Sequence, residues 1–235
     1  MAKNFDETYP LSIGVYLSVT LVAGSVIALQ IVVMRVFAVG SWVHFGSLVI
    51  SLAMFGFGLA SALMCIGTGF FDRHWRSSAA LSLTVFGPLA VGANLAAQQV
   101  PFNALFLISD PAQKWRLVAN FLLYFLPFLA GAFFLGSVFL WARSVFARVY
   151  FADLAGSGLS GLAMLGSMYV LAPANLILAP LALWTFGGLL WFRTMGSKLQ
   201  VTGFISAAAL AFAAHLMAPL LGLTTIAVSD YKAVS

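Results

Sequence analysis

The sequence predicts an all-α fold, a polytopic membrane bundle of about seven transmembrane helices. Of its 235 residues, 63% are hydrophobic and 7% are charged, and mean hydropathy is +1.05, whereas soluble chains are roughly a quarter charged. The charged residues leave six charge-free runs of 26 to 39 residues, and about 20 helical residues cross a bilayer. These runs lack strand alternation and far exceed the roughly ten residues of a barrel strand.

This composition excludes a soluble enzyme and a nucleic-acid-binding module, because the chain cannot cover its surface with polar groups in water. The single cysteine, Cys65, lies in an apolar run, which excludes a disulfide scaffold. The net charge of +5 is explained by basic residues that hold loops on the cytoplasmic side. An acidic partner is the alternative.

The first span is predicted to begin after Pro10, because the missing N–H of a proline costs nothing in the first helical turn. The longest run holds two helices with a break at Pro173-Ala174-Asn175, since a proline disfavours helix in the preceding residue. Pro88 is expected to kink the third helix. The predicted spans of this single domain, 1–235, are 11–39, 42–71, 78–98, 117–141, 149–171, 174–192 and 200–223.

Two segments outside the spans have an expected place. The charged segment Asp72-Arg73-His74-Trp75-Arg76 is predicted to form a cytoplasmic turn, with Asp72, Arg73 and Arg76 as its polar residues. Residues 99–115, apolar at first and charged later, are predicted to form an interfacial connector. The first span is expected to be retained rather than cleaved as a signal peptide, because its apolar stretch is long and Asp6 and Glu7 precede it.

The distribution of Lys and Arg predicts the orientation. With the N-terminus in the cytoplasm, seven basic residues fall on the cytoplasmic side and four on the other, which satisfies the positive-inside rule. The cytoplasmic set is Lys3, Arg73, Arg76, Arg143, Arg148, Arg193 and Lys198, and the other set is Arg35, Lys114, Arg116 and Lys232. We therefore expect a multi-pass membrane protein with its N-terminus in the cytoplasm.

Charged residues inside apolar segments are costly and mark candidate sites. Asp153, the only acid within a predicted span, could bind a proton or a cation, or it could cap its helix near the interface. Arg35 lies about one turn inside the first span. It could bind a substrate anion or a partner carboxylate, or its long stem could bring the guanidinium to the headgroups.

His44 and His215 are the other polar candidates, and both are expected in the outer half of the bundle. No pair of ligands with i,i+4 spacing accompanies either histidine, so we expect isolated histidines, no metal site and no cofactor. Motifs of hydrolases, metalloproteases and phosphate-binding loops are missing from the sequence. These features favour a protein without catalytic activity of its own.

Small residues gather in the second and fifth spans. Gly56 and Gly58 lie in the second span, and Gly156, Gly158 and Gly161 lie in the fifth. Small residues let helix backbones approach closely in lipid. Packing within the bundle, a moving transport element and a subunit interface are all compatible with such surfaces.

Three stretches resemble the membrane-embedded region of bacterial spermidine-synthase-like proteins, which are similar to polyamine aminopropyltransferases. They are Trp42-Val43-His44-Phe45 with 48–58 and the preceding Met34-Arg35, the Y-x-x-D-L-x-G-x-x-L pattern of 150–159, and the tail Ser229-Asp230-Tyr231-Lys232. The resemblance implies a location in the bacterial inner membrane. In longer relatives it also implies a Rossmann domain after the membrane region, and the present sequence stops where that domain would start. Separately, 69–76 resembles the cytoplasmic D-R-x-G-R turn of major facilitator transporters, with Trp75 in place of the glycine.

Two functions follow as expectations. The first is a non-catalytic anchoring or accessory subunit that resembles the membrane module of spermidine-synthase-like proteins and contacts lipid and other protein subunits. The alternative is transport of a small organic cation or metabolite, with Asp153 as the binding site. An enzyme fragment whose active site lies in a separate soluble chain is a third reading.

Overall fold

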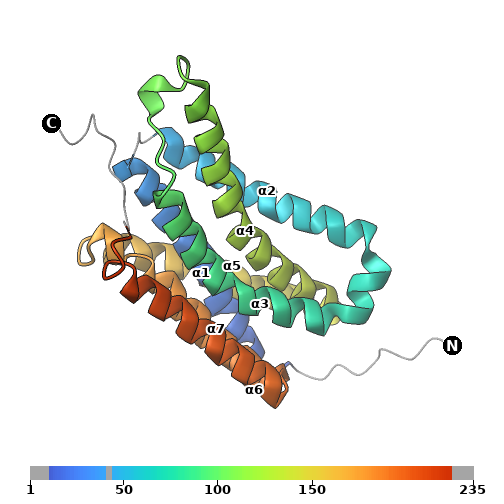
Figure 1. The fold of residues 1–235 in the computed structure, drawn as a ribbon. Helices are drawn as coiled ribbons and strands as arrows, with labels where there is room; N and C mark the ends of the chain where they lie inside the picture. The colour runs from blue at the N-terminus through green and yellow to red at the C-terminus, as the bar shows by residue number, and fades with distance from the viewer. Residues whose placement is uncertain (1–10, 41–43, 224–235) are drawn as a thin grey trace.

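A computed structural model describes residues 11–40 and 44–223, and this part of the chain is all helical (Figure 1). The predicted fold class is confirmed, with seven α-helices of which six are long and apolar enough to cross a bilayer. The helices are α1 (Ile13–Gly40), α2 (His44–Ile66), α3 (Thr68–Gln98), α4 (Pro111–Trp141), α5 (Phe146–Ser167), α6 (Leu178–Met195) and α7 (Lys198–Met217). Lys3, Trp42-Val43, the tail 229–232 and the side chain of His44 lie outside the described residues.

Helix α5 is the exception among the seven. Its 22 residues are enough to cross a bilayer, but it is not among the six helices that meet the apolarity of a span. Arg148, Asp153 and several glycines and serines lower its hydropathy. This helix packs along α1 instead of standing alone in lipid.

Helix α1 is the centre of the bundle. It contacts α5 and α6, and it also contacts α2 and α4. Helix α3 packs between α4 and α7, and Figure 1 shows α2 and α7 on opposite sides of the bundle. Because α2 and α7 are the least buried of the six spanning helices, their apolar outer faces contact the lipid bilayer.

Buried hydroxyl groups join α1 to its neighbours. The Ser18 hydroxyl donates to the Gly187 carbonyl of α6 at 2.8 Å, and the Ser25 hydroxyl donates to the Pro180 carbonyl at 2.7 Å. On the other side, a Cβ atom at Gly156 of α5 would collide with the backbone of Thr20. Close backbone approach of this kind replaces the hydrophobic drive that is missing between helices in lipid.

The basic residues of the loops gather at one end of the bundle, which we call the basic end. The start of α1 lies beside the end of α6 there, as the contact between Gly14 and Thr194 shows. The Asp72 carboxylate of α3 pairs with Arg143 after α4. The exposed basic residues of this end are Arg73, Arg76, Arg143, Arg148, Arg193 and Lys198. The topology count of the sequence grouped these same six residues on one side.

The predicted charged turn at 72–76 is only partly correct: the chain is kinked at His74, but the residues around it are helical and belong to the first turns of α3. Helix α2 already ends at Ile66, and the chain turns at Gly67. Within α3 the only non-helical backbone angles are at His74, so the helix continues through Pro88. A proline can stay inside a membrane helix when neighbouring groups satisfy the freed carbonyl.

The connection between α3 and α4 is shorter than predicted. Helix α4 begins at Pro111, where the Asp110 side chain accepts a hydrogen bond from the Ala112 N–H. A proline in the first helical turn and an aspartate at the N-cap both favour this start. The interfacial connector therefore covers 99–110 instead of 99–115. A 3-10 turn at Pro173–Asn175 separates α5 from α6, at the predicted break.

Candidate functional site

At the end of the bundle opposite the basic end, four buried polar residues join α3 to α4. We call Asn94, Gln98, Asn120 and Tyr124 the amide–tyrosine cluster. The Tyr124 hydroxyl donates to Asn94 Oδ1 at 3.1 Å and accepts from Gln98 Nε2 at 3.4 Å. Asn120 Nδ2 donates to the carbonyl oxygens of Val100 at 2.8 Å and Arg116 at 2.9 Å.

The amide–tyrosine cluster has a structural role. Its members are neutral, they are buried, and the Tyr124 hydroxyl and the Asn120 amide find partners within the chain. The Phe37 ring of α1 packs edge-on against Tyr124, with ring centroids 5.7 Å apart. Because buried polar groups cost free energy unless they are hydrogen-bonded, this hydrogen-bonded network stabilises the pairing of α3 with α4.

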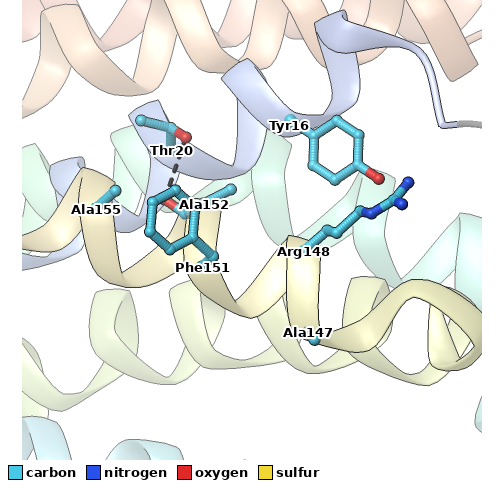
Figure 2. A pocket seen from close by; sticks show the side chains of 7 residues that line it. All are labelled: Tyr16, Thr20, Ala147, Arg148, Phe151, Ala152 and Ala155. Atoms are coloured by element: carbon cyan, nitrogen blue, oxygen red, sulfur yellow. Dashed lines mark hydrogen bonds between the residues drawn. The ribbon is translucent and has the colours of Figure 1, made fainter.

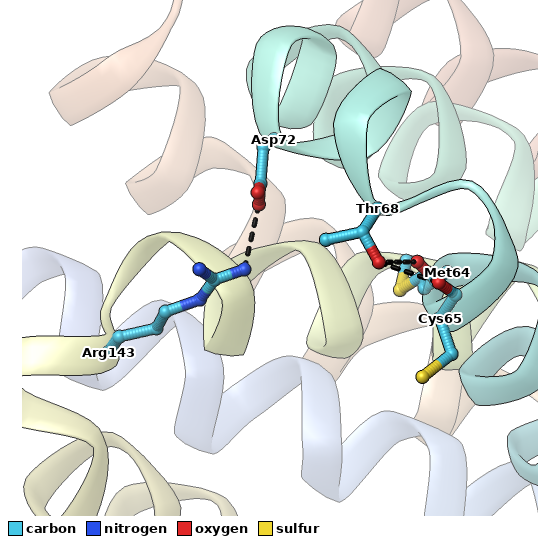
Figure 3. A network of polar contacts seen from close by, with 5 residues as sticks. All are labelled: Met64, Cys65, Thr68, Asp72 and Arg143. Carbon is cyan, nitrogen blue, oxygen red and sulfur yellow. Dashed lines mark hydrogen bonds and ion pairs between the residues drawn. The ribbon is translucent and has the colours of Figure 1, made fainter.

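The basic end carries a different set of groups. Arg143 donates to Asp72 at 2.8 Å, and both side chains remain substantially exposed. The Trp75 and Trp141 rings stack beside them with centroids 4.6 Å apart, and the Arg76 guanidinium lies over the Trp75 ring. Figure 3 shows the ion pair, together with the Thr68 hydroxyl that caps the end of α2 by donating to the Met64 and Cys65 carbonyls.

A groove of about 520 Å³ lies between α1 and α5 near the same end. Figure 2 shows the Tyr16 hydroxyl and the Arg148 guanidinium pointing toward one another, with Phe151, Ala152 and Ala155 along the rest of the groove. The Thr20 hydroxyl donates to the Ala152 carbonyl at 3.1 Å, so it is already satisfied. The Tyr16 hydroxyl oxygen is shielded from solvent and finds no hydrogen-bond partner in the described chain.

Asp153 and Arg35 are far apart. Asp153 is half-buried on α5, next to Ala152, which contacts Thr20 of α1. Arg35 lies fifteen residues beyond Thr20 on α1, which is about 22 Å at 1.5 Å per residue, and it is exposed. Within residues 11–40 and 44–223, neither side chain makes a hydrogen bond or an ion pair, and the two do not form a common site.

His215 of α7 is buried, and its Nδ1 atom has no partner among the described residues. A metal ion needs several such ligands. In the part of the chain that the structure describes, no group of three His, Cys, Asp or Glu side chains is positioned to hold one. His215 and Asp153 therefore stand as single polar groups.

The five glycines of the sequence patterns fall into two groups. Gly56 faces Phe128 and Leu129 of α4, Gly156 faces Thr20, and Gly161 faces Ile27. A Cβ atom at Gly58 or Gly158 would meet nothing within 4 Å. Two of the small-residue positions therefore point away from the described bundle.

The amide–tyrosine cluster and Tyr16 were not expected from the sequence. The first carried a signal, because Asn94 with Gln98 and Asn120 with Tyr124 are two i,i+4 polar pairs in consecutive apolar segments. The second carried none, since the approach of Tyr16 to Arg148 depends on how α1 packs on α5.

Comparisons with known proteins give no match to any protein-family model, any curated protein or any solved structure. Function is therefore inferred from the side chains that the fold brings together.

Proposed function

We propose that this multi-pass membrane protein is a non-catalytic anchoring or accessory subunit, in the manner of the membrane module of spermidine-synthase-like proteins. The observation that carries the proposal is the outer face of α2. Gly58 and Ala62 are both exposed there, in a small-x-x-x-small pattern, and α2 is poorly buried by its own bundle.

A glycine in a helix interior costs about 1 kcal/mol relative to alanine. Close contact of Gly56 with α4 offsets this cost, but Gly58 has no such contact within the described chain. A pair of small residues on a membrane helix lets a second helix approach closely. The outer face of α2 is therefore the surface on which we place a partner subunit.

Purification in mild detergent tests this function. The wild-type chain should elute with a second polypeptide at a fixed ratio by light scattering and mass spectrometry. The double substitution Gly58→Leu with Ala62→Leu should release that polypeptide without unfolding the bundle. Gly203→Leu is the matched control, because Gly203 is an exposed glycine of α7 with open space at its Cβ position. A protein that purifies alone as a monomer and has catalytic activity of its own would contradict the proposal.

The orientation belongs to the same proposal. We place the basic end in the cytoplasm of a bacterial cell, because membrane proteins retain Lys and Arg on that side. Ser144 is exposed at this end, so Ser144→Cys in a Cys65→Ser background reports its side. A membrane-impermeant maleimide should label inverted vesicles and leave intact spheroplasts unlabelled; the reverse pattern would contradict the orientation.

A second candidate function is transport of a small organic cation with Asp153 as the binding carboxylate. The observation that favours it is the half-buried position of Asp153 on α5 without an ion pair among the described residues. Helix α3 continues through Pro88, so the bundle offers little of the broken-helix geometry that is typical of transporter sites. Uptake into liposomes that is unaffected by Asp153→Asn would remove Asp153 from the transport mechanism.

A further inference from the structure

We infer that the groove between α1 and α5 binds one anionic phospholipid, with its phosphate between Tyr16 and Arg148. The position of the groove is the first reason. Tyr16 lies in the first turn of α1 and Arg148 in the first turn of α5, at the basic end. Tyrosine and arginine near helix ends lie at the level of lipid headgroups.

The polar atoms at this end of the groove are the second reason. The Tyr16 hydroxyl is shielded and has no partner in the described part of the chain. The Arg148 guanidinium, toward which it points in Figure 2, is likewise without an ion pair there. A hydroxyl and a guanidinium both donate to phosphate oxygens, and arginine can do so with two parallel hydrogen bonds.

The rest of the lining favours an acyl chain. Beyond Tyr16 and Arg148 the groove continues along Phe151, Ala152 and Ala155. Ala155 lies seven residues after Arg148, which is about 10 Å deeper at the rise of an α-helix. The groove, of about 520 Å³, is open on one side.

The charge of the groove determines which phospholipid headgroup it favours. Among the described residues, the groove is lined by one guanidinium and by no carboxylate, and Asp153 of α5 is not part of the lining. A zwitterionic headgroup would leave its ammonium group without a partner. An anionic headgroup such as phosphatidylglycerol leaves no cation to satisfy, so the groove favours it.

Lipid-dependent thermal stability of the full chain in detergent tests the inference. Dioleoyl-phosphatidylglycerol should raise the unfolding temperature saturably, and dioleoyl-phosphatidylcholine and inorganic phosphate should not at equal concentration. Arg148→Gln should raise the lipid concentration at half-saturation about tenfold, as expected for loss of a charge-assisted hydrogen bond. Tyr16→Phe should raise it about threefold. Arg193→Gln removes an exposed charge of the same end outside the groove and should leave half-saturation unchanged.

Native mass spectrometry gives a second readout that does not depend on unfolding. Wild type and Arg193→Gln should each retain one phosphatidylglycerol, and Arg148→Gln should retain none. Equal weakening by Arg193→Gln and Arg148→Gln would show diffuse attraction to the basic end and overturn the inference. A shift produced by phosphate alone, or equally by phosphatidylcholine, would also overturn it. The inference would also be overturned if the wild-type chain bound no lipid while the double variant Asp6→Asn with Glu7→Gln did. The carboxylates of the chain would then compete with the lipid for the groove.

Discussion

Two buried tyrosine hydroxyls, one near each end of the bundle, have opposite surroundings. The Tyr124 hydroxyl donates to Asn94 and accepts from Gln98, whereas the Tyr16 hydroxyl is shielded without a partner among the described residues. Leaving a buried donor unpaired costs about 1 to 3 kcal/mol. The comparison shows that a hydrogen-bonded polar cluster stabilises the fold. A buried hydroxyl that is unpaired beside a groove indicates where a ligand can supply the missing hydrogen bond.

The largest expected effect comes from separating α1 from α5. Gly156→Leu places a side chain against the Thr20 backbone, and backbone cannot move aside as a flexible side chain can. We expect a loss of about 3 kcal/mol in the free energy of unfolding, at the upper end for overpacking, measured by denaturation in detergent. The groove should be lost as well, so phosphatidylglycerol should no longer raise the unfolding temperature.

Gly158→Leu is the control for this substitution. It lies on the same helix two residues away, and its Cβ position is open. Its unfolding free energy should equal or exceed that of wild type, because leucine favours helix over glycine. Equal losses in the two variants would show that the α1–α5 packing described here is not what holds α5 in place.

The next effect is at the amide–tyrosine cluster. Tyr124→Phe removes the hydroxyl that serves both Asn94 and Gln98, and the buried Asn94 oxygen then loses its donor. We expect the unfolding free energy to fall by about 1 kcal/mol, since hydrogen bonds between membrane helices average somewhat less than that and an unpaired group adds to the cost. Tyr169→Phe changes a side chain that is 93% exposed and should have no effect.

Much of this fold was open to prediction because charge is so expensive in lipid. The charge-free runs indicated all seven helices, and the Pro173 break divided the longest of them correctly. The same logic was less exact at Asp72–Arg76, since helix α3 carries these exposed charges on both sides of a kink at His74. Hydropathy reports where the chain leaves the bilayer, and it does not report where the helix ends.

The candidate site was less predictable for a physical reason. Asp153 and Arg35 attracted attention as charges in apolar segments, but their positions on separate elements gave no information about distance. Tyr16 and Arg148 are 132 residues apart in sequence, and the packing of α1 on α5 brings them together. A prediction from one sequence contains no such pairing, because many helix packings satisfy the same hydropathy.

Tyr16→Phe should change the free energy of unfolding less than Tyr124→Phe does. The sign of the change should depend on whether anionic lipid is present. In detergent without anionic lipid, removing an unpaired buried hydroxyl should leave stability unchanged or raise it by about 0.5 kcal/mol. With phosphatidylglycerol present, the variant should be less stable than wild type, because it gains less from the lipid. Unfolding curves with and without the lipid check this reversal; a loss of stability in both conditions would show that Tyr16 has a partner within the chain.

The smallest expected effect is at the ion pair between Asp72 and Arg143. The side chains are 43% and 59% exposed, and exposed pairs contribute about 0.2 to 1 kcal/mol at most and weaken with salt. In a double-mutant cycle of Asp72→Asn and Arg143→Gln, we expect a coupling energy below about 0.5 kcal/mol that vanishes at high salt. A larger, salt-resistant coupling would mean that the basic end is held together by its charges. A small coupling would mean that these charges add little to folding, which leaves them available to anionic headgroups at the membrane surface.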